Sequence, residues 1–234
     1  MELVRKMKIR KLTLLTNKLE EEKLFYSNTL GFELKKEGSD SFTIRVGWSE
    51  LTFKRSKEKH TYHYCFLIPS NQLHEALEWM EERVEIIAIE NEGKIQWFDT
   101  WNARSFYFYD ASGNLAEFIV RYDLENESNR EFGISSLLCV NEIGMATTQV
   151  EHLNSQLERQ LSTQFWKGDL VRFATNGSQE GLFLIPNYEI KTVWFPSRQP
   201  IVPEPFETTI ENEGVLYDLN FRNEQLEITK AGNL

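Results

Sequence analysis

The sequence holds few side chains whose types suggest metal or nucleophilic chemistry. It has four histidines and two cysteines, and it contains no Cys-x-x-Cys pair, glycine-rich phosphate loop or nucleophile elbow. His63 stands in the aromatic run YHYCFLI, and Glu117 stands in GNLAEF. Imidazole and carboxylate groups that share one sheet face can bind a divalent cation. The alternation of a strand would place His63 on one face with Cys65 and Leu67.

A strand and helix unit of the order βαβββ positions these residues, and its first copy opens the chain. Leu12 and Leu14 alternate with polar residues, which predicts a strand with one dry face. A helix is expected from about residue 19 to residue 30, ending at Gly31 in a left-handed cap. The runs SFTIRV and SELTFKRS then predict two further strands after a turn at 38–40.

The second copy carries His63 and Glu117. Its first strand ends at Pro69, and a helix follows with one apolar stripe. The stripe consists of Leu73, Ala76, Leu77, Met80 and Val84. Three segments then predict strands: EIIAI, ARSFYFYD and, after a tight turn at 110–113, LAEFIVRY.

The second half of the chain repeats the pattern more faintly. A helical stripe over 150–161 follows the strand-like VNEIGMATT, and a hairpin comes next, whereas the last repeat shows no helix. The charged segment 123–133 predicts a linker between a domain at 7–122 and a diverged domain at 134–234. Because one βαβββ unit cannot bury its sheet face alone, we expect units to pair. The predicted fold is α+β, with curved mixed sheets around a cup and helices outside.

Composition narrows the class of partner. The chain of 234 residues has a net charge of −10 with interleaved signs and no basic block, so it shows no nucleic-acid footprint. No apolar stretch is long enough to cross a membrane, and no signal peptide is evident. Cys65 and Cys139 lie in apolar runs, which indicates buried thiols in a reducing compartment. We therefore expect a cytoplasmic protein.

Two signatures resemble the vicinal oxygen chelate superfamily, which includes glyoxalases, bleomycin resistance proteins and extradiol dioxygenases. The first is LEEEKLFYSNTLGFEL, with an acidic helix start, Phe-Tyr and then Leu-Gly-Phe. The second is RSFYFYDASGNLAEF, with the Asp-x-x-Gly-Asn turn and the final glutamate. Together they cover residues 9–122. The resemblance implies a divalent metal in the cup that binds two vicinal oxygens of a small molecule.

Carried onto this chain, the resemblance implies three metal ligands. His63 begins the first strand of its unit, and Glu117 takes the place of the family's most regular carboxylate, with a catalytic role. Glu50 in SELTF matches the carboxylate of the lactoylglutathione lyase branch. One imidazole and two carboxylates suit Fe, Mn, Ni or Zn. The implied activity is lyase-like or that of a ring-cleavage dioxygenase.

One ligand place departs from the family pattern. The first strand usually contributes His, Gln or Glu eight residues before the opening Leu of the helix, and here that place holds Lys11. A protonated lysine has no lone pair to give to a cation. Lys11 could instead pair with Glu117 and leave a metal-free cup. The alternative function is therefore a drug-binding or small-molecule-binding protein of the bleomycin resistance type, without catalysis.

Further side chains are expected to bind the small molecule. Trp101 could stack on a ligand, Arg104 could hold a carboxylate, and Lys11 could contact it. Glu142 falls at the first-strand ligand place of the third repeat, but its half of the chain offers no histidine after residue 152, so a structural role is preferred. The family also brings the expectation of a homodimer.

Overall fold

The computed structural model describes residues 6–90 and 93–233, which form two curved sheets and three α-helices. The α+β class and the mixed sheets expected from the sequence are confirmed. Among the described residues, no helix combines the length and the apolar character needed to cross a bilayer.

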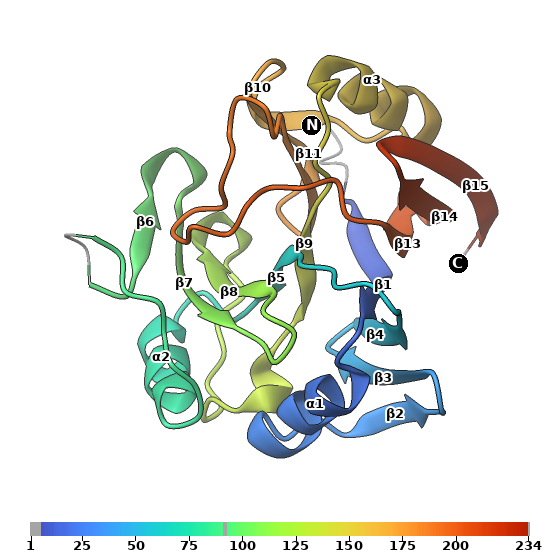
Figure 1. The fold of residues 1–234 in the computed structure, drawn as a ribbon. Helices are drawn as coiled ribbons and strands as arrows, with labels where there is room; N and C mark the ends of the chain where they lie inside the picture. The colour runs from blue at the N-terminus through green and yellow to red at the C-terminus, as the bar shows by residue number, and fades with distance from the viewer. Residues whose placement is uncertain (1–5, 91–92, 234) are drawn as a thin grey trace.

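The first sheet has seven strands. In spatial order they are β15 (Gln225–Asn233), β14 (Val215–Arg222), β13 (Phe206–Asn212), β1 (Lys8–Thr16), β4 (Ser49–Arg55), β3 (Ser41–Val46) and β2 (Leu34–Glu37). β1 pairs in parallel with β4 and antiparallel with β13, so it lies at the centre. Figure 1 shows the C-terminal strands beside the blue β1.

The second sheet has eight strands and carries the candidate site. In spatial order they are β10 (Phe165–Asp169), β11 (Phe173–Ser178), β12 (Gly181–Pro186), β9 (Cys139–Gly144), β5 (His63–Leu67), β8 (Leu115–Arg121), β7 (Ala103–Tyr109) and β6 (Gln96–Phe98). Its two central strands, β5 and β9, are antiparallel. The expected strand EIIAI is not formed, because Ile86 and Ile89 make only isolated bridges.

Each sheet draws on both halves of the chain. The first unit (β1–β4) shares a sheet with the fourth (β13–β15), and the second unit (β5–β8) shares one with the third (β9–β12). The expectation that units pair is met by the second unit with the third and by the first unit with the fourth. An unpaired strand edge presents the same backbone groups to any partner, so the sequence of β1 or β5 does not select one. Whether 7–122 and 134–234 fold as separate domains stays a prediction.

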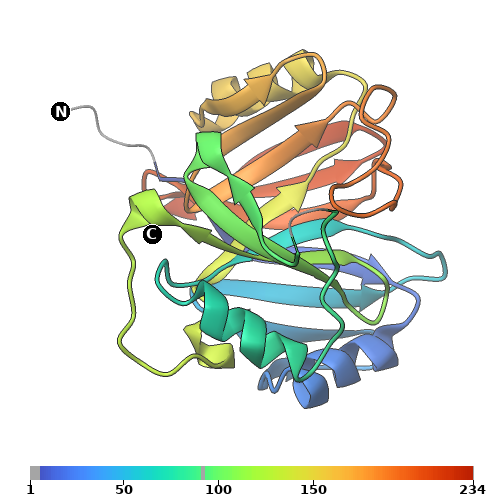
Figure 2. The same ribbon diagram turned by 90° about the vertical axis from the view of Figure 1, so that its left-hand side faces the viewer.

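Three α-helices accompany the sheets: α1 (Leu19–Leu24), α2 (Leu73–Glu81) and α3 (Val150–Leu161). α1 continues as one π-helical turn over Phe25–Thr29, and Gly31 at φ +78° takes the left-handed conformation expected of the helix end. The apolar stripe predicted for α3 is buried, and in the stripe predicted for α2 Leu73, Ala76 and Met80 are buried while Leu77 and Val84 are half-buried. Figure 2 shows α1 and α2 at one end of the molecule and α3 at the other.

Side chains alternate between the two faces of the second sheet, so the main core and the candidate site lie on opposite faces. Tyr64 and Phe66 of β5, together with Phe118 of β8, join a large apolar core that also holds Leu12 and Leu14 of β1. The other residues of β5 and β8 project from the opposite face of the second sheet. That face is also buried, because a chain segment from the C-terminal half covers it.

Candidate metal centre

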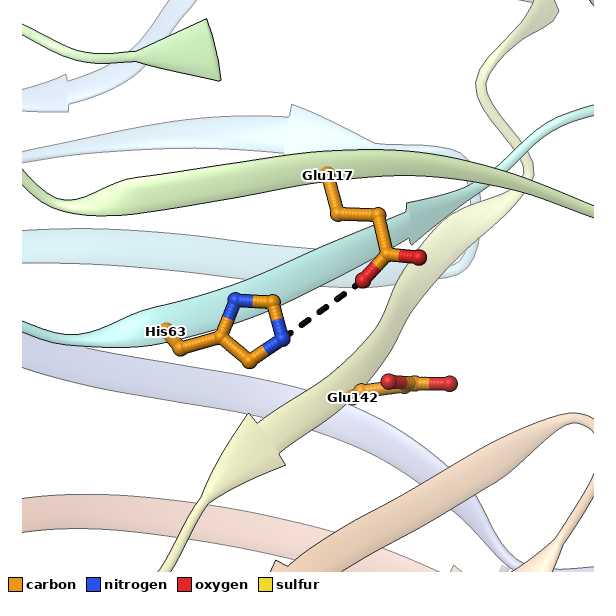
Figure 3. Close-up of side chains that lie close together, drawn as sticks. All are labelled: His63, Glu117 and Glu142. Carbon is orange, nitrogen blue, oxygen red and sulfur yellow. Dashed lines mark ion pairs between the residues drawn. The ribbon is translucent and has the colours of Figure 1, made fainter. Parts of the chain in front are cut away.

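Three side chains converge on the outer face of the second sheet. His63 comes from β5, Glu117 from β8 and Glu142 from β9, which are adjacent strands. Cys65 pairs with Glu117 on one side and with Glu142 on the other, so the two carboxylates flank β5 at one level. His63 lies two residues before Cys65 and projects from the same face. Figure 3 shows the three side chains pointing toward one another.

The geometry of these groups suits a cation. Their ligand atoms all lie within 4.8 Å of one another, and His63 Nε2 is 3.5 Å from Glu117 Oε2. His63 Nδ1 donates a hydrogen bond to the Leu115 carbonyl oxygen at 3.0 Å. Because a carbonyl oxygen only accepts, Nδ1 carries the proton and Nε2 keeps a lone pair on the side of the carboxylates. Burial lowers the pKa of His63 to about 4, so the ring is neutral near pH 7.

A buried arginine supplies positive charge beside the carboxylates. The guanidinium of Arg121 forms an ion pair with Oε1 of Glu142, and its Nε donates to Asn141 Oδ1 at 3.0 Å. It lies 5.5 Å from the ring centroid of Trp101 and 5.2 Å from that of Trp166. The indole rings shield the ion pair from water, which strengthens its electrostatic attraction.

The two carboxyl groups raise each other's cost of ionisation. Burial raises the pKa of Glu117 to about 8, and the charge of Glu142 adds to the rise, whereas Ser105, Tyr107 and Arg121 oppose it. Burial also raises the pKa of Glu142, and Arg121 opposes that rise. Near neutral pH the metal-free site therefore holds a proton on Glu117. A ligating carboxylate must be ionised, so a bound cation would displace this proton.

The third unit offers no fourth ligand at the matching place. Glu117 lies two residues beyond the β8 partner of His63. Leu184 lies two residues beyond the β12 partner of Glu142, and it lines the same cavity. Leucine has no lone pair to give to a cation. Among the described residues, three potential ligands therefore lie on one side of the candidate metal position, and the hydrocarbon side chain of Leu184 lies on the other. That arrangement leaves coordination positions for a small molecule.

A cavity of about 170 Å³ adjoins the three side chains, and we call it the cup. Besides His63, Glu117 and Glu142, its lining residues are Phe98, Trp101, Tyr107, Phe173, Leu184, Lys191, Trp194 and Phe195. Most of these walls are aromatic or aliphatic. A ligand in the cup would therefore be largely desolvated except where polar groups meet it.

The connection 187–205 joins β12 to β13 and covers the cup, and we call it the strap. Its Trp194 packs against His63 with ring centroids 4.7 Å apart. Further along, Glu204 binds His60 Nδ1 at 2.6 Å and the Thr61 amide at 3.0 Å. These contacts hold a segment that has no helix or strand. The prolines of residues 194–207 favour an extended connection, but nothing in the sequence indicates that it lies over the cup.

Gly144 allows Trp194 to approach His63. A Cβ at this position would lie 2.6 Å from Cζ2 and 2.9 Å from Cη2 of Trp194. We expect Gly144→Ala to lower the free energy of unfolding by about 1–3 kcal/mol. The cost should shrink in a Trp194→Phe background, because phenylalanine lacks both atoms. Urea unfolding of this double-mutant cycle measures the effect, with Gly133→Ala, whose Cβ would meet nothing within 4 Å, as the control. Equal costs in the two backgrounds would contradict the contact.

Glu50, the third ligand expected from the family resemblance, lies elsewhere. It stands on β4 in the first sheet, where its carboxylate forms ion pairs with Lys35 and Arg45. These contacts lower its pKa, with the hydrogen bond from Lys35 as the largest cause. Its side chain therefore cannot join His63 in one site, and Glu142 stands in its place. The place of Glu142 in its repeat was a signal that could have identified it, although a structural role was expected for it from the sequence.

Lys11 also lies outside the cup. It pairs with Glu50 across β1 and β4, and its side chain is exposed. It therefore neither pairs with Glu117 nor contacts a ligand of the cup. It lines an open hollow of about 410 Å³ on the first sheet, with Thr13, Glu207, Thr209 and other mostly polar residues.

Of the two remaining residues that were predicted to bind the ligand, one lies in the cup and the other does not. Trp101 lines the cup, as its proposed contact with a ligand requires. Arg104 is exposed and stacks on Trp97, with 4.9 Å from its guanidinium carbon to the ring centroid. It is not among the residues that line the cup, because it points to the opposite face of β7 from Ala103 and Ser105. Arg121 was not anticipated from the sequence.

Comparison with known proteins supports the fold. No protein-family model matches the sequence, and no curated protein matches it. A Bacillus subtilis structure described provisionally as a dioxygenase matches 96% of this chain and 85% of its own, at 12% identity and a TM-score of 0.56. At that identity the likeness establishes the fold and not the activity.

Two shorter structures match about half of the chain. Lactoylglutathione lyase from Agrobacterium tumefaciens covers 48% of this chain and 92% of its own, at 17% identity and a TM-score of 0.41. A fosfomycin resistance protein from Listeria monocytogenes, solved with Mn(II) and sulfate, covers 47% and 86%, at 21% identity and a TM-score of 0.36.

Proposed function

We propose that this chain, whose fold and sequence signatures resemble those of the vicinal oxygen chelate superfamily, is an enzyme that acts on a small molecule with the help of a divalent metal ion in the cup. The observation that carries this proposal is the convergence of His63, Glu117 and Glu142 in one buried cluster. The reaction would be of the lyase or ring-cleavage dioxygenase type. A cytoplasmic homodimer stays a prediction.

The donor set fits such an ion. A neutral imidazole with its lone pair free and two carboxylates suit Fe, Mn, Ni or Zn. When bound, the ion supplies a Lewis acid that stabilises negative charge on two adjacent substrate oxygens. Among the described residues, the guanidinium of Arg121 is the one permanent positive charge in contact with the two carboxylates, so the cluster with both carboxylates ionised carries one negative charge in excess, which favours a cation.

The surrounding residues prepare the cup for this chemistry. The Leu115 carbonyl fixes the tautomer of His63, and Arg121 holds Glu142 in place and opposes the rise that burial causes in the pKa of Glu142. Trp194 covers His63 and excludes water from it. Glu117, the residue with the raised pKa, would give up its proton on binding the ion and then serve as the central carboxylate ligand.

A second candidate function is a binding protein without a metal. The ion pair between Arg121 and Glu142, together with a protonated Glu117, leaves the cluster close to neutral. The apolar cup could then sequester a small molecule unchanged. Lys11 no longer argues for this candidate, since it lies on the other sheet.

Metal content distinguishes the two candidates. We expect protein that has been stripped with a chelator and reloaded with Mn(II), Fe(II), Ni(II) or Zn(II) to retain about one equivalent of at least one ion, and its melting temperature to rise. Glu117→Gln and Glu142→Gln should each weaken binding by at least about tenfold, because each removes a ligand charge. Mass spectrometry after desalting gives the stoichiometry.

Glu50→Gln is the matched control, since it removes one carboxylate outside the cluster. It should bind as much metal as the wild type. Loss of metal in Glu50→Gln, or retention in both cluster variants, would contradict the site. Absence of metal from all four proteins would favour the binding protein.

A further inference from the structure

The strap carries a lysine into the aromatic part of the cup. Lys191 is half-buried, and its ammonium lies 5.6 Å from the ring centroid of Trp194 and 5.9 Å from that of Phe173. It donates a hydrogen bond to the Val193 carbonyl oxygen at 2.8 Å. Trp194 also packs against His63, so this indole connects the lysine to the metal centre.

Lys191 has no carboxylate partner within the part of the chain that the structure describes. The ion pairs found in residues 6–90 and 93–233 do not include it. Burial and the nearby charge of Arg172 lower its pKa to about 8, so it remains mostly protonated near neutral pH. An ammonium among aromatic rings with one backbone acceptor keeps unused donors and an uncompensated charge.

The shape and lining of the cup limit what could complete this site. Six aromatic side chains line the cavity: Phe98, Trp101, Tyr107, Phe173, Trp194 and Phe195. A volume of about 170 Å³ suits one aromatic ring with small substituents, since an apolar cavity of about 150 Å³ accepts benzene. A flat ligand can stack on these walls while one polar end reaches Lys191.

We propose that Lys191 determines the specificity of the cup, and that the ligand is a planar aromatic molecule with an anionic group, such as a carboxylate, bound to this lysine. The inference rests on the proposed function only in placing two adjacent oxygens at His63, Glu117 and Glu142. Selection of the anionic group is a property of the strap and holds with or without metal. Lys191 thus determines which small molecule binds, whereas His63, Glu117 and Glu142 hold the metal ion that acts on it.

The test compares ligands that differ in charge and little in shape. Benzoate and benzamide are titrated into chelator-treated protein, and 3,4-dihydroxybenzoate and its amide into Mn(II)-loaded protein, by calorimetry near neutral pH. In wild-type protein we expect each acid to bind at least about tenfold more tightly than its amide, as for a hydrogen bond to a charged group. Lys191→Met should abolish this preference and leave the affinity for the amide unchanged.

Two variants serve as controls. Lys191→Arg retains the charge and should retain the preference. Lys36→Met removes one exposed positive charge on the other sheet and should behave as wild type. Equal affinity for acid and amide in the wild type, a preference that survives Lys191→Met, or no binding of any of the four probes would overturn the proposal. Because the benzoate pair is measured without metal, a failure of metal binding alone leaves the result on Lys191 readable.

Discussion

Replacing Arg121 with methionine is expected to lower the free energy of unfolding of the metal-free protein by about 3–5 kcal/mol. The guanidinium is fully buried and forms the ion pair with Glu142. Without it, Glu142 is left in a dry site beside Glu117, and it must either stay charged without a partner or take up a proton. Both outcomes cost stability near neutral pH.

The loss has a second source that must be separated from the first. Arg121 lies against Trp101 and Trp166, so methionine also removes cation–π contacts with both rings. The double variant Arg121→Met, Glu142→Gln removes the charge that arginine neutralises and keeps the same loss of stacking. We expect it to recover a large part of the lost stability, because replacing both partners of a buried pair is often close to neutral.

Urea unfolding near neutral pH after chelator treatment measures all three free energies. Addition of Mn(II) gives an independent check, since a cation at the carboxylates should restore part of the stability of Arg121→Met and none of that of the double variant. A double variant no more stable than Arg121→Met would assign the loss to stacking. Arg121 would then be a packing residue and not the one that holds Glu142 for the metal.

Local sequence was sufficient for most of the elements, although not for the segment EIIAI, and for two members of the site. Period-2 alternation placed His63 and Glu117 on strands whose inner faces are set by apolar neighbours. The helix at 150–161 was likewise evident from periodicity, and the extended stretch 194–207 from its proline content. These signals come from residues close together in sequence, and they do not depend on which distant strands pair in the folded protein.

The third ligand could not be chosen in this way, because it depends on which units share a sheet. Glu142 stands at the ligand place of its repeat, just as Lys11 does in the first repeat. β5 pairs with β9, which brings Glu142 to His63, whereas β1 pairs with β13, which removes Lys11 and Glu50. The pairings that form and the alternative pairings of the same strands would bury the same apolar faces. They differ only in contacts between residues that lie far apart in sequence.

Lys191 and Arg121 were missed for the same physical reason. Lys191 lies in a stretch without periodicity, and its position is fixed by contacts of the strap with β5 and the residues just before it. Arg121 ends an apolar strand, where a charged residue ordinarily indicates the return to solvent. Its burial follows from Trp166 in β10, which the third unit brings over it.

A different buried acid gives the second large prediction, and it concerns pH. Glu22 of α1 lies in the core beside Asp110 in the turn between β7 and β8. Asp110 accepts hydrogen bonds from Ser112, Asn114 and the Tyr64 hydroxyl, the last at 2.6 Å. Glu22 accepts hydrogen bonds from the Ser112 amide at 2.9 Å and from Asn114 Nδ2 at 3.4 Å. Burial, and then the charge of Asp110, raise the pKa of Glu22 to about 11. The pair therefore shares one proton, which Glu22 holds.

This proton makes folding stability fall as the pH rises. The unfolded chain releases it near the ordinary value of 4.5, whereas the folded protein keeps it to about 11. Between those values the folded state binds more protons, so the free energy of unfolding drops by up to about 1.4 kcal/mol per pH unit for this group. Glu117 contributes in the same direction up to about pH 8 in the metal-free protein.

Glu22→Gln isolates the contribution of Glu22, because an amide resembles the protonated carboxyl group and cannot lose a proton to water. Its oxygen can accept from Ser112, and its nitrogen can donate to Asp110. We expect stability within about 1 kcal/mol of wild type near pH 4.5, the ordinary pKa of the carboxyl group, and a gain over wild type that grows steadily up to about pH 9. Urea unfolding at intervals of pH measures the gain, with the exposed Glu21→Gln as control. A constant difference in stability between Glu22→Gln and wild type across this range would show that Glu22 is already ionised in the folded protein. Its carboxylate would then be stabilised by hydrogen-bond donors.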